Sequence, residues 1–151
     1  MISMGVKEIL EFIKIEHTLF SLPFILIGYI LAFNQFMHDL PVSEFSWFRM
    51  DLIWILVAAI GARGLAMSLN RIVDKDIDAA NPRTQGRHLA TGTMSIQTAS
   101  ILAGCFLLML LIGAGLLNKV ALMMSWLPVL AFVIYPYTKR YTWLCHLWLG
   151  L

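Results

Sequence analysis

The side chains with the clearest chemical potential lie in the middle of the chain. Asn70, Asp74 and Asp78 follow one another at intervals of four residues. On an α-helix, at about 100° per residue, this spacing places the three side chains within about 80° of one another. Arg63 precedes Asn70 by seven residues and would lie on the same face.

Two carboxylates and an amide carbonyl on one helix face are suited to a hard cation. Mg²⁺ prefers oxygen ligands and often joins one or two carboxylates to a substrate phosphate. The spacing therefore indicates a Mg²⁺–diphosphate site formed by Asn70, Asp74 and Asp78. A charged, solvated loop would carry the same residue types, so the spacing alone leaves both interpretations open.

The composition of the chain is typical of a membrane protein. Of its 151 residues, 60% are hydrophobic and 13% are charged, and the mean hydropathy is +0.79. A soluble domain usually carries about 25% charged residues. The chain has no dense basic stripe, so we expect no nucleic-acid partner. We expect an all-α, polytopic transmembrane helix bundle whose surroundings are membrane lipid.

Four apolar segments are long enough to cross a membrane as helices, namely residues 18–37, 52–69, 98–117 and 120–137. At 1.5 Å per residue, about 18–20 residues cover a hydrocarbon core about 30 Å thick. A fifth apolar run starts at Trp143 and stops with the chain at Leu151. We therefore expect four full spans and the start of a fifth, with residues 1–151 forming the amino-terminal part of one larger domain.

Two shorter features predict how these spans are connected. Residues 6–16 have apolar side chains at helical intervals with charged side chains between them, which predicts a helix along the membrane surface. Only Asn118 and Lys119 separate the third apolar segment from the fourth. Such a short connection predicts an antiparallel hairpin.

The basic residues are distributed unevenly between the two sides of this predicted bundle. One side carries only Arg49 and Lys119, and the other side carries Lys7, Lys14, Arg71, Lys75, Arg83, Arg87, Lys139 and Arg140. By the positive-inside rule, the side rich in basic residues faces the cytoplasm. We expect the protein to lie in the plasma (inner) membrane of a prokaryotic cell, with its site at the cytoplasmic side.

Several short motifs surround the candidate residues. Asn70-Arg71-x-x-Asp74-x-x-x-Asp78 precedes Asn81-Pro82-Arg83-Thr84 and Arg87-x-x-x-x-Gly92, and the fourth span closes on Tyr135-x-x-x-Lys139. In this order the motifs resemble those of the UbiA-type intramembrane aromatic prenyltransferases. The segment from Glu16 to Pro23 resembles the branch of that family that acts on quinone precursors such as 4-hydroxybenzoate.

The resemblance implies transfer of a polyprenyl group from a polyprenyl diphosphate to an aromatic acid in quinone biosynthesis, with Mg²⁺ as cofactor. It implies catalytic, metal-binding roles for Asn70, Asp74 and Asp78. It implies contacts with the diphosphate for Tyr135 and Lys139, and it allows a similar role for Arg71.

Arg63 stands apart because it lies inside a predicted span. An arginine within the membrane is costly and usually faces a cavity or a partner, so we expect Arg63 to bind substrate. The alternative is that its side chain extends to the membrane interface.

The resemblance also implies about nine membrane helices and a second Asp-rich motif after the sixth. We therefore expect the 151-residue chain alone to be inactive. A non-catalytic fragment and a membrane transporter subunit are the alternative functions. A transporter typically has charges or broken helices near the midplane of several spans. Here the acidic residues gather at one mouth of the bundle, which favours the enzyme.

The expected topology can be tested by labelling single cysteines. Replacing Ser43 and Thr93 in turn by cysteine places a thiol in one loop on each side of the membrane. An impermeant maleimide added to intact cells should label position 43 and leave position 93 unmodified until the membrane is opened. Labelling of position 93 alone from outside would contradict the assignment.

Overall fold

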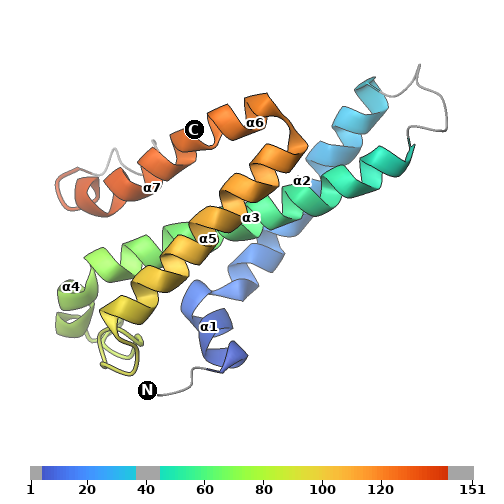
Figure 1. The fold of residues 1–151 in the computed structure, drawn as a ribbon. Helices are drawn as coiled ribbons and strands as arrows, with labels where there is room; N and C mark the ends of the chain where they lie inside the picture. Colours follow the sequence, from blue (N-terminus) through green and yellow to red (C-terminus); the bar gives the residue numbers. More distant parts are fainter. Residues whose placement is uncertain (1–4, 37–44, 143–151) are drawn as a thin grey trace.

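The computed structural model describes residues 5–36 and 45–142, and this part of the chain is all-α (Figure 1). Its helices are α1 (Val6–Ile13), α2 (Ile15–Phe36), α3 (Phe45–Val73), α4 (Lys75–Ala80), α5 (Ile96–Leu117), α6 (Lys119–Met124) and α7 (Trp126–Thr138). The predicted helical fold class is confirmed. The predicted start of a fifth span, 143–151, lies outside the described residues.

Three stretches of the described helices are long and apolar enough to cross a membrane, namely Met50–Val73, Ile96–Leu117 and Lys119–Thr138. They coincide with the predicted spans at 52–69, 98–117 and 120–137. The predicted first span at 18–37 corresponds to α2. A fourth span is obtained when Val6–Ile13 and Thr18–Ala32, which meet at a bend of 68°, are counted as one.

The amphipathic segment at the amino terminus is helical, but its helix ends at Ile13 and not at residue 16 as predicted. The reason is local, because Lys14 has a left-handed backbone with φ of 54°, which a right-handed helix cannot continue. α2 then starts at Ile15 in a new direction. Phe12 is buried, and Val6 on the outer face is exposed.

The chain turns back between α5 and α6, as the predicted hairpin between the third and fourth spans requires (Figure 1). Asn118 ends α5 and begins α6, and its Oδ1 accepts a hydrogen bond of 2.7 Å from the Ala121 N–H. The fourth span is interrupted at Ser125, where α6 gives way to α7. Pro128 accounts for the interruption, since it has no N–H to donate to the carbonyl of Met124.

The centre of the fold is a close contact between α3 and α5, which run side by side in opposite directions (Figure 1). A Cβ atom on Gly61 would lie 2.5 Å from the backbone nitrogen of Leu110. One on Gly113 would lie 2.8 Å from the backbone nitrogen of Ala58. Small residues of this kind let membrane helices pack backbone to backbone.

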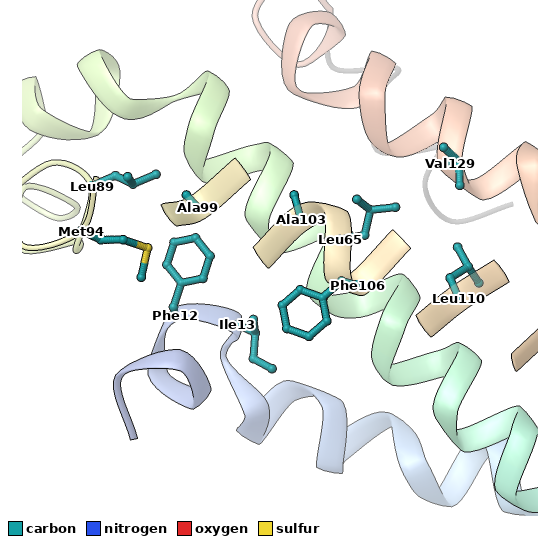
Figure 2. Close-up of a cluster of buried hydrophobic side chains, with 10 residues drawn as sticks. All are labelled: Phe12, Ile13, Leu65, Leu89, Met94, Ala99, Ala103, Phe106, Leu110 and Val129. Atoms are coloured by element: carbon teal, nitrogen blue, oxygen red, sulfur yellow. The ribbon is translucent and has the colours of Figure 1, made fainter. Parts of the chain in front are cut away.

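A cluster of buried side chains extends from the α3–α5 contact to α7 at one end and to α1 with the 81–95 connection at the other (Figure 2). Phe106 of α5 lies against Gly64 of α3, and Val129 joins the cluster from α7. At the other end, Phe12 of α1 packs with Leu89 and other residues of the 81–95 connection. The cluster therefore fixes α1, α7 and the 81–95 loop relative to α3.

Substitution of Gly61 by alanine should test whether the close contact stabilises the fold. The added methyl group would push α3 away from α5, which should lower the free energy of unfolding by about 1–3 kcal/mol. The matched control is Gly104→Ala in α5, where a Cβ would meet nothing within 4 Å. Unfolding in a denaturing detergent gives both values, and equal effects would contradict the packing argument.

Candidate active site

The helical spacing of the predicted site residues persists where α3 ends. The Asp74 N–H donates to the carbonyl of Asn70 at 3.0 Å, and the Asp78 N–H donates to the carbonyl of Asp74 at 2.8 Å. Asp74 itself lies at the break between α3 and α4. The backbone thus carries Asn70, Asp74 and Asp78 on successive turns at one end of the bundle.

Lys139 at the end of α7 joins the first two of these residues. Its Nζ donates a 2.6 Å hydrogen bond to Asn70 Oδ1 and forms an ion pair with Asp74 Oδ2. Arg140 approaches from the other side, with Nη2 3.3 Å from Asp74 Oδ1 and 2.9 Å from the carbonyl oxygen of Val73. Asp74 is only 4% exposed, so the two cations compensate a buried carboxylate.

Asp78 is directed to a different partner. Its two carboxylate oxygens accept hydrogen bonds of 2.9 and 2.7 Å from Nη1 of Arg87, and its backbone carbonyl accepts one from the Thr84 hydroxyl. The described residues contain no group of three His, Cys, Asp or Glu side chains that could hold a metal. Asn70 and Asp74 thus share the partner Lys139, whereas Asp78 pairs with Arg87 of the 81–95 loop.

A cavity of about 600 Å³ opens beside the Asn70–Lys139 contact, between α2, α3 and α7. Its polar lining residues are Ser21, Arg63, Asn70, Tyr135 and Lys139, and its apolar lining includes Ile25, Met67 and Phe132. Lys139 Nζ lies 5.7 Å from the centre of the Tyr135 ring. The cavity thus has a polar, cationic end at Asn70 and Lys139, which we call its mouth, and an apolar wall formed by residues such as Ile25, Met67 and Phe132.

Arg63 lies within the membrane span and lines this cavity, as its position in the sequence predicts. Its buried Nε has no hydrogen-bond partner among the described residues. A buried guanidinium donor without an acceptor is costly, so this wall of the cavity is suited to an anionic or carbonyl-bearing group.

Arg71 does not line the cavity with the other predicted residues. It lies one residue beyond Asn70, about 100° further around α3, and its guanidinium carbon is 5.0 Å from the centre of the Phe12 ring. It lines a separate pocket. Conversely, Arg140 was predicted to matter only for topology, although its position next to Lys139 was a usable signal.

Comparisons with known proteins bear on this arrangement. Residues 20–151 match the model of the UbiA prenyltransferase family. A protein of Coxiella burnetii (strain CbuK_Q154) named 4-hydroxybenzoate octaprenyltransferase is 31% identical over 104 residues, which cover 69% of this chain and 36% of that protein. A protein of the same name from Shewanella pealeana is 35% identical over 106 residues, covering 66% of this chain and 36% of that one.

Among solved structures, the apo structure of a UbiA homologue from Aeropyrum pernix K1 is similar. The TM-score is 0.73 at 36% sequence identity, and the match covers 89% of this chain and 45% of the other. The chain spans about a third of the length of the curated relatives it matches, with 36% for both the Coxiella and the Shewanella protein.

The Asp78–Arg87 pair should stabilise the 81–95 loop. Arg87→Met would leave a buried carboxylate without its donor and should lower the free energy of unfolding by about 1–3 kcal/mol. Arg83→Met is the matched control, since Arg83 is exposed on the same loop and its guanidinium forms no ion pair with any of the described residues. A chemical or detergent unfolding series measures both, and equal losses would argue against the pair.

Proposed function

Because the chain belongs to the UbiA prenyltransferase family, we propose that it acts in the transfer of a polyprenyl group from a polyprenyl diphosphate to an aromatic acid. The relatives named 4-hydroxybenzoate octaprenyltransferase favour 4-hydroxybenzoate as the acceptor, in quinone biosynthesis. As the chain covers only part of those relatives, the activity of the whole protein is part of the proposal.

The observation that carries the proposal is the contact of Lys139 with Asn70 and Asp74, since Lys139 and Asn70 line one end of a cavity whose other lining is largely apolar. A polyprenyl diphosphate has a charged head and a long hydrocarbon tail. The polar mouth suits the head, and the apolar wall with the surrounding lipid suits the tail. A cavity shielded from water also protects a reactive allylic cation.

The oxygen atoms at the mouth fit a bound Mg²⁺. Asn70 Oδ1 and Asp74 Oδ2 both contact one cationic atom, Lys139 Nζ, so they already converge on a point of positive charge. One or two carboxylates together with a substrate phosphate are a common Mg²⁺ environment in enzymes. When bound, Mg²⁺ would neutralise charge on the diphosphate. Asp78 would contribute only if it left Arg87.

The protein's own residues would act on the leaving group and on the acceptor. As the allylic C–O bond breaks, its electron pair stays with the diphosphate, and Lys139, which lines the cavity, would stabilise that charge together with the neighbouring Arg140. A ring carbon of the acceptor then forms the new C–C bond, and the ring loses a proton. Arg63, which lines the same cavity, would bind the acceptor's carboxylate.

The membrane setting of the site is also part of the proposal. The uneven distribution of basic residues favours a cytoplasmic position for the mouth formed by Asn70, Asp74 and Lys139. The diphosphate substrate would then enter from the cytoplasmic leaflet, with its tail in lipid.

Substitution of Asp74 tests this function directly. Asp74→Asn removes the carboxylate that pairs with both cations, and it should lower the rate of prenyl transfer by at least about 10²-fold. The assay follows labelled prenyl diphosphate into 4-hydroxybenzoate in membranes that contain the whole protein, of which residues 1–151 are a part, with thermal stability as the check on folding. The matched control is Asp76→Asn, an exposed acid two residues away, which should keep full activity.

A further inference from the structure

A second pocket lies outside the candidate active site. It has a volume of about 580 Å³ and is formed by the α1–α2 junction, the end of α3 and the 81–95 loop. None of its lining residues belongs to the cavity between α2, α3 and α7. Its charged lining comprises four cations and two carboxylates, namely Lys14, Arg71, Arg83, Arg87, Glu11 and Glu16.

Arg71 is the most unusual of these residues. The residue is only 3% exposed, yet its buried Nε has no hydrogen-bond partner in the part of the chain that the structure describes. Phe12, which is fully buried, holds the guanidinium in place from α1. Because a buried donor without an acceptor is costly, the pocket is suited to a ligand that accepts hydrogen bonds.

The rest of the pocket wall is held by hydrogen bonds. Arg87 is fixed by both oxygens of Asp78, and the hydroxyl of Thr93 donates to the carbonyl of His88 at 3.1 Å. The Thr84 hydroxyl donates to the carbonyl of Asp78 at 3.1 Å. These bonds order the loop, so Arg87 is in position before a ligand arrives.

The charges of the wall favour an anion with several oxygen atoms. The cations come from three separate segments, with Lys14 between α1 and α2, Arg71 on α3, and Arg83 and Arg87 on the loop. A phosphate group accepts charge-assisted hydrogen bonds from several directions at once, as such an arrangement requires. Of the two carboxylates in the lining, Glu11 lies 3.9 Å from the ammonium of Lys7. Asp78, behind the wall, already pairs with Arg87, so Lys14, Arg71 and Arg83 supply most of the uncompensated positive charge.

The pocket also lies beside a surface suited to lipid. Val6 and Leu10 on the outer side of α1 are large apolar residues that remain exposed. An amphipathic helix of this kind commonly lies in the headgroup region, and basic pockets at the cytoplasmic face are known to bind anionic headgroups. The phosphate could therefore come from a phospholipid or from solution.

We propose that the pocket between α1 and the 81–95 loop is a phosphate-binding site centred on Arg71. It is separate from the proposed catalytic mouth, because Arg71 and Asn70 point to different faces of α3. Loss of the catalytic cluster should therefore leave binding here intact.

The test is equilibrium binding to the purified chain in an uncharged detergent at low salt. One arm uses labelled inorganic phosphate, and the other uses labelled phosphatidylglycerol in mixed micelles, with phosphatidylcholine as the comparison. Saturable binding is expected in at least one arm. Binding of inorganic phosphate identifies a soluble ligand, and preference for phosphatidylglycerol identifies a lipid headgroup.

Variants locate the bound anion. Arg71→Gln and Gly86→Glu should each weaken binding at least about 10-fold, since the first removes a positive charge from the wall and the second adds a negative one. A Cβ at Gly86 would meet nothing within 4 Å, so a side chain fits there. Gly86→Gln, which differs from Gly86→Glu only in charge, should bind at least about fivefold more tightly than Gly86→Glu.

Lys75→Gln and Asp74→Asn are controls outside the pocket. Both variants should bind phosphate like the wild type, because neither residue lines the pocket. If Arg71→Gln fails to fold, the Gly86 pair decides the matter. The proposal is overturned if neither arm shows saturable binding, if Gly86→Glu binds as tightly as Gly86→Gln, or if Asp74→Asn abolishes binding.

Discussion

The backbone contact between α3 and α5 is the constraint on which the rest of the structure depends. In lipid, helices gain little from burying apolar side chains, and close packing of small residues supplies the attraction. Gly61 faces α5, and Asn70 lies nine residues later, about 180° around the helix. Packing one face of α3 against α5 therefore turns the opposite face, with Asn70 and Arg63, toward the cavity.

Ion pairs at one end of the bundle attach further segments to this packed helix pair. Asp74 ties α7 to α3 through Lys139 and Arg140, and Asp78 ties the 81–95 loop to α4 through Arg87. Both carboxylates are buried, so neither could remain charged at low cost without its partner. The two acids of the motif thus hold different segments, although the sequence presents them as equivalent.

The sequence could predict what depends on local spacing. The three apolar spans, the hairpin at Asn118 and the helical register of Asn70, Asp74 and Asp78 all follow from periods of 3.6 residues and from segment length. The partner of Asp78 could not be predicted, because it depends on the path of the loop that carries Arg87. The end of α1 at Lys14 could not be predicted either, since it rests on one residue's backbone conformation. The separate position of Arg71 could have been predicted. It follows Asn70 directly in the sequence, so it lies about a quarter turn away from the helix face that Asn70, Asp74 and Asp78 share.

Lys139 connects the stability of the bundle with the proposed chemistry. Without a bound ligand, the buried Asp74 carboxylate needs a positive charge nearby and the Asn70 carbonyl accepts a hydrogen bond, and the ammonium of Lys139 supplies both. A diphosphate that entered with its own cation could take over that requirement, and the same ammonium would then be free to donate to the diphosphate. Charge neutralisation would be maintained throughout, with little rearrangement of the helices. A donor already in place when the leaving group develops its charge is the condition under which electrostatic catalysis is most effective.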